Sequence, residues 1–176
     1  MTAARPATLW GWDPPIEAPH RLASVMRARN MGRYYGNGRH WATPPEIFGP
    51  LDAEFGFTLD PCCTPATAKC ARYYTEAEDG LAQDWSAERV FMNPPYGREL
   101  AAWTRKARNE AERGALVVGL LPASTDLAWW HEDVLAAGAE VRFVRGRIRF
   151  LLDGRRWANA FMPSVVVIWR PVEVLA

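Results

Sequence analysis

Short apolar runs separated by mixed polar segments dominate the chain from residue 41 onward. Three of these runs, at residues 89–92, 115–121 and 164–169, are nearly continuous rather than alternating. A continuous apolar run of this length is typical of a strand that is buried on both faces of a sheet. We therefore predict a central sheet that other elements cover on both sides.

The segment between the first two runs has the periodicity of a helix. Over residues 99–113, Leu100, Trp103 and Ala107 recur on one face, and Gly114 follows as a helix-ending residue. Weaker patterns predict the remaining elements: a helix at 44–51 with Thr43 as a candidate N-cap, a strand at 56–61, a helix or an irregular connection at 65–74, a helix at 127–137, a strand at 141–144 and a turn region at 150–157 around Asp153-Gly154.

The alternation of strands and helices predicts the α/β class, with a mainly parallel sheet and helices on both faces. In such sheets, ligands bind beyond the carboxyl ends of the strands. Three predicted strands end in segments that contain proline: Asp60-Pro61, Asn93-Pro94-Pro95-Tyr96 and Pro122-Ala123-Ser124. We expect these strand ends to form a crevice on one edge of the sheet.

Residues 1–38 differ in composition from the rest of the chain. Prolines punctuate the first part, glycines close the segment, and Arg21, Arg27, Arg29 and Arg33 have few acids nearby. Two interpretations are open: a mobile, solvated terminus, or a basic arm that binds phosphates and becomes ordered on nucleic acid. Since the chain has 176 residues, we predict that residues 39–176 form a single domain.

The composition limits the classes of protein that the chain can represent. The formal net charge is +1, so any contact with nucleic acid must depend on local charge. No apolar run is long enough to span a bilayer, and the N-terminal residues lack the apolar core of a secretory signal. Cys62, Cys63 and Cys70 have neither the spacing of a zinc site nor that of a disulfide framework. We therefore expect a cytoplasmic protein with reduced thiols, no membrane span and no metal.

The segment Asn93-Pro94-Pro95-Tyr96 has an unusual composition for the end of a buried strand. Two consecutive prolines lack N–H donors and have a restricted φ, so they end the strand in a rigid corner. The corner presents an amide side chain, unpaired carbonyl oxygens and an aromatic ring. These groups suit a planar ligand that carries an amino group, because the oxygens accept hydrogen bonds and the ring stacks.

A series of motifs in a defined order carries a resemblance over residues 41–170: Trp41-Ala42-Thr43-Pro44-Pro45, Asp60-Pro61-Cys62, Asp79-Gly80-Leu81, Asn93-Pro94-Pro95-Tyr96, Leu121-Pro122-Ala123 and Arg145-Gly146-Arg147-Ile148-Arg149-Phe150. This ordered set resembles the phage-type (Dam-like) DNA N6-adenine methyltransferases. The resemblance implies a Rossmann-like methyltransferase fold, with residues 39–176 as the catalytic domain. It also implies S-adenosylmethionine as the cofactor and double-stranded DNA as the partner.

The resemblance implies catalytic roles for Asn93, Pro94, Pro95 and Tyr96. The N6 nitrogen of adenine is a poor nucleophile because its lone pair is delocalised into the ring. Hydrogen bonds from N6 to the Asn93 side-chain oxygen and the Pro94 carbonyl would localise that lone pair for attack on the sulfonium methyl group. The target base must be flipped out of the duplex, and Tyr96 would stack on it.

Further motifs of the resemblance imply the residues that contact the cofactor: Trp41, Thr43, Pro44, Asp60, Pro61, Cys62, Asp79 and Leu81. The Thr43 hydroxyl would bind the methionine carboxylate at a helix start. Asp60 would meet the methionine ammonium or neighbouring polar groups, and Asp79 would accept from the adenine amino group. Glu76 and Glu78 are both candidates for binding the ribose. Most methyltransferases have a glycine-rich loop after the first acidic strand end, whereas this chain continues with Cys62-Cys63-Thr64.

A basic segment near the C-terminus is the candidate DNA contact. Its predicted DNA-binding residues are Arg145, Arg147, Arg149, Phe150 and Arg155, and Phe150 is also a candidate to sandwich the flipped base. The simpler interpretation is a solvated sheet edge that is protected by charge. The DNA target sequence cannot be inferred from these residues.

Two other functions are compatible with parts of the pattern. The atypical segment after Asp60 would suit a nucleic-acid-binding protein that has lost catalysis. The Asn-Pro-Pro-Tyr motif also occurs in methyltransferases that act on a glutamine amide nitrogen in proteins. Those enzymes usually keep the glycine-rich loop and lack the Trp-x-Thr-Pro start, so the DNA enzyme fits this sequence better.

Overall fold

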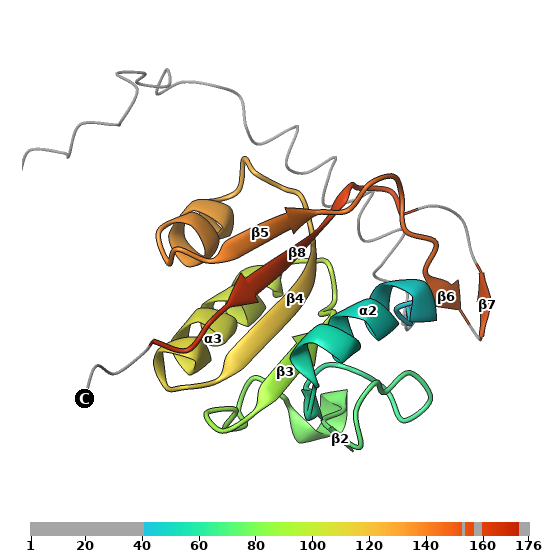
Figure 1. The fold of residues 1–176 in the computed structure, drawn as a ribbon, viewed down its shortest axis with the longest axis horizontal. Helices are drawn as coiled ribbons and strands as arrows, with labels where there is room; N and C mark the ends of the chain where they lie inside the picture. Colours follow the sequence, from blue (N-terminus) through green and yellow to red (C-terminus); the bar gives the residue numbers. More distant parts are fainter. Residues whose placement is uncertain (1–40, 153, 157–159, 173–176) are drawn as a thin grey trace, which may run out of the picture.

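The computed structural model describes residues 41–152, 154–156 and 160–172 (Figure 1). The elements in this part of the chain are α2 (Pro45–Phe55), β1 (Leu59–Asp60), β2 (Arg72–Tyr73), η1 (Glu76–Glu78), β3 (Arg89–Met92), α3 (Leu100–Glu112), β4 (Leu116–Pro122), η2 (Trp130–Leu135), β5 (Glu140–Phe143), β6 (Leu151–Leu152), β7 (Arg155–Arg156) and β8 (Ser164–Trp169). The predicted arm at 1–38 lies outside the described residues, so both interpretations of it stay open.

A six-stranded sheet with the order β2-β1-β3-β4-β8-β5 forms the centre of the fold. Strands β2, β1, β3 and β4 pair in parallel, whereas β8 runs antiparallel between β4 and β5. Because β4 and β5 are both antiparallel to β8, they point in the same direction. The prediction of a mainly parallel α/β sheet is therefore confirmed.

The strand order reverses next to β1. From β1 the chain adds β2 on one side, and it then returns to place β3 on the other side. At such a switch point the connections leave neighbouring strand ends in opposite directions, which opens a crevice. Asp60 ends β1 and Asn93 directly follows β3, so two of the predicted strand ends meet at this point.

Helices cover both faces of the sheet, as predicted. On one face, Leu51 and Phe55 of α2 pack in a buried cluster with Phe91 of β3. On the other face, Trp103 of α3 and Val134 of η2 belong to a second buried cluster. Figure 1 shows the sheet running between α2 and α3. The continuous apolar runs of β4 and β8 follow from this arrangement, because their successive side chains enter opposite clusters.

Helix α2 differs from the predicted helix at both ends. Its N-cap is Pro44 rather than Thr43, and no side chain caps its first turn. The helix continues through Pro50 for another turn, because that turn buries Leu51 and Phe55 against the sheet. It ends at Gly56, which adopts φ 60°. A left-handed residue at this position is a common end for a helix, and glycine adopts it without a steric penalty.

Two short strand pairs lie where the sequence indicates only turns or an open choice. Residues 65–74 form turns followed by β2, which pairs with β1. The predicted turn region at 150–157 contains a hairpin of β6 and β7, with Gly154 at φ 73°. A glycine with positive φ between two strands favours a tight hairpin. Strands of two residues have no periodicity, so the sequence cannot reveal them.

The predicted helix at 127–137 is partly a π-helix, η2. Trp129 and Trp130 are consecutive, and both are buried against the sheet. Asp133 joins η2 to α3, since it accepts from the Thr104 hydroxyl at 2.9 Å and pairs with Arg108.

No helix of the described residues has the length and apolar character needed to cross a bilayer.

A buried carboxylate joins α3 to the loop that precedes β3. Glu110 accepts from the Trp85 backbone N–H at 3.0 Å, from Lys106 at 2.7 Å and from Arg113 at 2.8 Å. The Trp85 ring is fully buried, and its Nε1–H donates to the Gly80 carbonyl at 3.0 Å. These contacts hold the loop at 79–85 in place beside the sheet edge. That loop forms one wall of a cavity at the edge of the sheet.

Candidate active site

A cavity of about 390 Å³ opens at the switch point between β1 and β3. This volume lies within the range of about 300–1,000 Å³ that is typical of small-molecule sites. The sequence-predicted residues that line it are Trp41, Pro61, Cys62, Asp79, Leu81, Asn93, Pro94, Pro95, Tyr96 and Phe150. Segments that are distant in the sequence therefore meet here. The predicted cofactor residues Thr43, Pro44 and Asp60 do not line the cavity.

Asn93 lies at the cavity wall with one end of its amide engaged. Its Nδ2 donates to the Thr43 hydroxyl at 3.2 Å. Among the described residues, no hydrogen bond is made to its Oδ1 or to the carbonyl of Pro94. Asn93 and Pro94 both line the cavity, so these two oxygens are candidate acceptors for a ligand that carries an amino group.

Tyr96 is buried and its ring lines the cavity. Its hydroxyl donates to the Leu120 carbonyl of β4 at 3.0 Å. Strand β3 ends at Met92, opposite Gly119, so β4 extends beyond its neighbour at this point. The hydroxyl therefore satisfies a β4 carbonyl that β3 does not reach. This anchor holds the ring in one position at the edge of the sheet.

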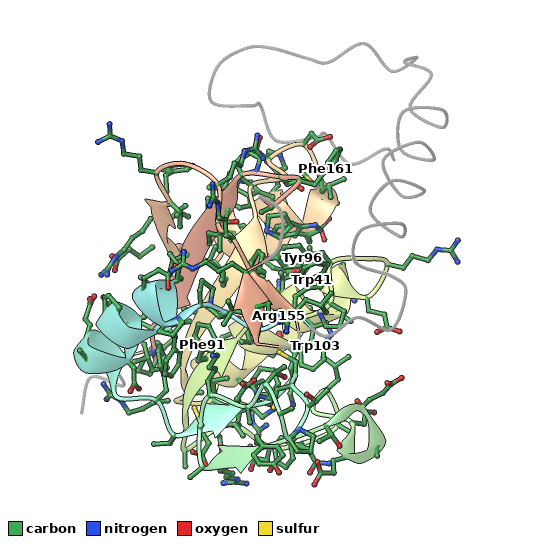
Figure 2. All side chains as sticks on the ribbon, turned by 90° about the vertical axis from the view of Figure 1, so that its right-hand side faces the viewer. Trp41, Phe91, Tyr96, Trp103, Arg155 and Phe161 are labelled. Carbon is green, nitrogen blue, oxygen red and sulfur yellow. The ribbon has the colours of Figure 1, made fainter. Side chains whose placement is uncertain are left out.

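Trp41 and Phe150 come together through a β-bridge. Ala42 and Leu151 exchange two backbone hydrogen bonds of 2.9 Å, which places their neighbours side by side. Phe150 is buried in the cluster with α2, and Trp41 is half-buried. Figure 2 shows Trp41 close to Tyr96 on the face of the molecule that holds the cavity. The cavity thus has several aromatic walls.

Asp60 is buried and meets the backbone of its own loop. Its Oδ2 accepts from the Lys69 N–H at 3.0 Å, and its Oδ1 accepts from the Cys62 N–H at 3.4 Å. Burial raises the pKa of this carboxyl to about 6, and the two hydrogen bonds oppose the shift. The sequence leaves two kinds of partner open for this carboxyl: the methionine ammonium of the cofactor, or neighbouring polar groups. The structure shows the second kind, since both hydrogen bonds come from the backbone. The carboxylate shapes the loop at 61–69 that forms one side of the cavity.

The two acidic candidates for ribose binding have different surroundings. The Glu78 carboxylate accepts from the Thr75 backbone N–H at 2.8 Å and completes a capping box at the start of η1. Glu76 lines the cavity instead. It follows shortly after the carboxyl end of β2, so the topology brings it to the same edge as Asn93. Glu76 is therefore the better placed of the two.

The loop after η1 makes a tight contact with the loop after β1. Asp79 adopts φ 49°, and its Oδ1 accepts from the Leu81 N–H at 3.2 Å. Such local hydrogen bonding is a reason why aspartate tolerates this conformation. A Cβ on Gly80 would lie 2.0 Å from the Pro61 carbonyl oxygen. Only glycine lets these two cavity walls approach so closely.

Several cavity residues have no signal in the sequence that would select them: Cys63, Thr67, Thr75, Glu99 and Trp103. Trp103 is predicted as a core residue of α3, and it is indeed buried and stacked on Trp85 with ring centroids 6.1 Å apart. It also forms part of the wall. The spacing of apolar residues along a helix cannot distinguish the core from a cavity, since both require an inward-facing side chain.

The three cysteines are poor candidates for nucleophiles. Burial raises the pKa of the Cys62 thiol well above its usual value, and it raises those of Cys63 and Cys70 to about 12. The thiols are therefore protonated at neutral pH, whereas the thiolate is the reactive form. Within the described ranges, no three His, Cys, Asp or Glu side chains are grouped to hold a metal ion.

The predicted DNA-binding residues have different environments. Arg145, Arg147, Arg149 and Arg155 are exposed, whereas Phe150 is buried at the cavity. Arg147 donates to the Phe161 carbonyl at 2.9 Å, which ties its loop to the segment before β8. Other arginines of the same basic region are ion-paired: Arg142 with Glu54 and Glu140, and Arg156 with Glu46.

The sheet order and the cavity at its switch point place the chain among α/β proteins of the methyltransferase type. The chain belongs to the DNA N-6-adenine-methyltransferase (Dam) family, whose model matches residues 36–174. This match confirms the resemblance that the order of motifs indicates.

Two relatives extend the comparison. The DNA N-6-adenine-methyltransferase of Escherichia phage T1 is 28% identical over 122 residues, which cover 68% of this chain and 50% of the phage protein. The putative methyltransferase YfdM of Escherichia coli K12 is 45% identical over 67 residues, which cover 34% of this chain and 72% of that protein. This chain thus spans about half the length of its phage T1 relative.

Proposed function

We propose that this protein transfers a methyl group from S-adenosylmethionine to the N6 amino group of adenine in double-stranded DNA. The observation that carries the proposal is Asn93 at the wall of the switch-point cavity, with its amide oxygen available and its amide nitrogen engaged. Membership of the Dam family and the similarity to the phage T1 DNA N-6-adenine-methyltransferase support the same reaction.

The cavity suits an elongated ligand that has polar and flat parts. Glu76 would hold the ribose hydroxyls, while Asp79 and Leu81 would contact the cofactor adenine. Trp41, Pro61 and Cys62 complete the proposed cofactor wall. When bound, the cofactor supplies a methyl group on a sulfonium, and its neutral thioether leaving group makes a strong general base unnecessary. Cofactor contacts by Thr43, Pro44 and Asp60 remain predictions from the sequence.

The protein would act on the target nitrogen by orientation. The Asn93 Oδ1 and the Pro94 carbonyl accept hydrogen bonds from the two N6 hydrogens, which localises the nitrogen lone pair and aims it at the methyl group. Pro95 stiffens the backbone that carries these oxygens, because proline has a restricted φ. The proton that N6 loses then passes to solvent.

Aromatic side chains at the cavity would hold the base once it leaves the duplex. Tyr96 stacks on the flipped adenine, and Phe150 encloses it from the side of the β-bridge. Stacking on an aromatic side chain contributes roughly 1–3 kcal/mol per base, which offsets part of the cost of unstacking the base. The buried position of Phe150 supports this role rather than a contact with the DNA surface. Arg145, Arg147, Arg149 and Arg155 would contact phosphates.

The substitution Asn93→Ala tests the proposal. We expect it to lower the rate of methyl transfer to DNA by at least roughly 10²-fold, as loss of a preorganised polar group does in other enzymes. The dissociation constant for S-adenosylmethionine should change little, because the cofactor wall is intact. The measurements are incorporation of labelled methyl groups into DNA, mapping of the methylated base by sequencing, and titration calorimetry.

Asn109→Ala is the matched control, since Asn109 is an exposed residue of α3. It should leave both the rate and the affinity unchanged. Full activity of Asn93→Ala would remove Asn93 from the mechanism. A wild-type protein that binds DNA without binding S-adenosylmethionine would instead support the inactive nucleic-acid-binding alternative.

A further inference from the structure

We propose that Thr43 is a positioning residue: its hydroxyl orients the Asn93 amide so that the amide oxygen faces the target nitrogen. The inference rests on the proposed function, and it assigns Thr43 a role different from the cofactor contact that its motif implies. Its basis is the 3.2 Å hydrogen bond from Asn93 Nδ2 to Thr43 Oγ1.

An asparagine amide has two ends of nearly equal size and opposite hydrogen-bonding character. Its oxygen accepts, whereas its nitrogen only donates. An adenine amino group offers hydrogens, so it needs the oxygen end. With Nδ2 directed to Thr43, the Oδ1 of Asn93 is the end left for the cavity. A reversed amide would place donors against donors and would not localise the nitrogen lone pair.

The backbone is anchored on both sides of Thr43 along the chain. Ala42 is tied to Leu151 by two hydrogen bonds of 2.9 Å. The Pro44 carbonyl accepts from the N–H groups of Ile47 and Phe48 at the start of α2. Thr43 lies between these two anchors and has only 2% of its surface exposed. The hydroxyl is therefore well suited to act as a rigid reference for a neighbouring side chain.

Two simpler roles for Thr43 do not match its contacts. Its side chain does not cap α2, for which the N-cap is Pro44. It also does not line the cavity in which the cofactor is proposed to bind. The backbone of Asn93 has a separate anchor, because its N–H contacts the thiol of Cys62. Thr43 is thus the contact that acts on the side chain of Asn93 rather than on its backbone.

The first test compares Thr43→Val with Thr43→Ser. Valine keeps the shape but removes the hydroxyl, whereas serine keeps the hydroxyl. We expect Thr43→Val to lower kcat roughly tenfold, the loss expected when one hydrogen bond ceases to orient a reacting group, with the S-adenosylmethionine affinity within about twofold of wild type. Thr43→Ser should restore most of the rate.

Thr104→Val is the matched control. Thr104 is also fully buried, and its hydroxyl donates to Asp133 at 2.9 Å, away from the cavity lining. Its loss should reduce stability but leave kcat per folded molecule unchanged. A similar fall in kcat for Thr104→Val and Thr43→Val would show that general structural damage causes the effect of Thr43→Val.

A second test uses the symmetry of a carboxylate. In an Asn93→Asp background, the Thr43 hydroxyl would donate to one carboxylate oxygen, and the equivalent second oxygen would accept from the target whichever way the side chain is turned. The effect of Thr43→Val on the single-turnover rate should therefore be several-fold smaller in this background than with Asn93 present. An equal effect in both backgrounds would overturn the positioning role.

A readout without catalysis separates this inference from the proposed function. In the NMR spectrum of the free protein, Thr43→Val should shift the Asn93 side-chain amide signal and speed its hydrogen exchange, and Thr43→Ser should restore it. If Thr43→Val produces these NMR changes but the wild-type protein does not methylate DNA, the proposed function alone is refuted. An unaffected amide signal, an unchanged kcat, or a weakened cofactor affinity with kcat retained would overturn the role of Thr43.

Discussion

At the scale of single residues, Asp60 shows that the same side chain suits a ligand contact or a structural role. The end of a strand before a proline is a common place for a ligand-binding acid, and the sequence cannot distinguish this from a loop anchor. Here the carboxyl is buried and accepts from the backbone of Lys69 and Cys62. Its neighbours in space come from the loop that folds back over it. The cost of that burial should be measurable.

The pKa of Asp60 predicts a specific dependence of stability on pH. The folded state raises this pKa from 3.8 to about 6, so the folded protein holds the proton more tightly than the unfolded chain. The free energy of unfolding should therefore fall as pH rises from about 4 to 6, by about 3 kcal/mol in total, and then stay level. The measurement is urea unfolding at several pH values.

Asp60→Asn provides the comparison for this prediction. The variant lacks the titrating group. The difference in unfolding free energy between wild type and variant should therefore change with pH in the way predicted for Asp60. The asparagine can accept only one of the two backbone hydrogen bonds, which adds a constant offset at every pH. A difference that stays constant between pH 4 and 7 would show that burial does not raise the pKa of Asp60.

At the scale of elements, the site depends on two loops rather than on strands. Strands β1 and β2 have two residues each, and the cavity walls are the segments that follow them. The contact between Gly80 and the Pro61 carbonyl sets the distance between these walls. Trp85 and Glu110 hold the second loop from behind. The spacing of the walls is therefore a property of how the loops pack.

Gly80→Ala should force the two loops apart. The added Cβ would meet backbone atoms of Pro61, which cannot move aside as a flexible side chain can. We expect a loss of about 1–3 kcal/mol in stability, typical of overpacking, and an affinity for S-adenosylmethionine at least tenfold lower. Thermal unfolding and calorimetry measure the two effects. Gly49→Ala is the matched control, because a Cβ there has no atom within 4 Å.

In the control, helix α2 gains a better helix former, so its stability should be equal or slightly higher. Unchanged cofactor affinity in Gly80→Ala would mean that the cofactor does not bind between the loops at 61–63 and 79–81. That result would also count against Asp79 and Leu81 as cofactor contacts.

The elements with a continuous apolar run or a helical period are the ones that the sequence predicts well. The predicted strands at 89–92 and 164–169 coincide with β3 and β8, and the helix at 99–113 contains α3. Their burial requires apolar residues at every position of a strand or on one face of a helix, which makes them visible in the sequence. Strand β2 and the β6–β7 hairpin consist of two-residue strands, and η2 differs from an ordinary helix only by a wider turn. Such features arise from packing and leave no pattern of their own.

At the scale of the whole molecule, the formal net charge is only +1, so any contact with DNA must depend on local charge. Several arginines of the C-terminal half are neutralised locally, such as Arg142 between Glu54 and Glu140. Arg145 and Arg147 are exposed in the loop after β5, which precedes the cavity residue Phe150. A locally basic face near the proposed base pocket is expected of a protein that binds DNA through phosphates.

Replacing both Arg145 and Arg147 by alanine should weaken DNA binding and reduce its salt dependence. Each lost phosphate contact lowers the slope of log K against log salt by roughly 0.9, so the double variant should lose about 2 in slope. Binding isotherms between about 50 and 200 mM salt measure this change. Arg105→Ala, which removes an exposed arginine of α3, should leave the slope unchanged. An unaltered slope in the double variant would mean that this loop does not contact phosphates.

The sequence alone determined the class of the fold, the family and the corner at residues 93–96, because these depend on burial patterns and on a continuous motif. The tertiary structure decided which of the predicted residues face the cavity. In the structure, the Thr43 hydroxyl contacts Asn93, and Asp60 accepts hydrogen bonds from its own loop. Glu76 lines the cavity, whereas Glu78 caps η1. These outcomes depend on contacts between segments far apart in the chain, and such contacts are set by how the loops pack rather than by local pattern.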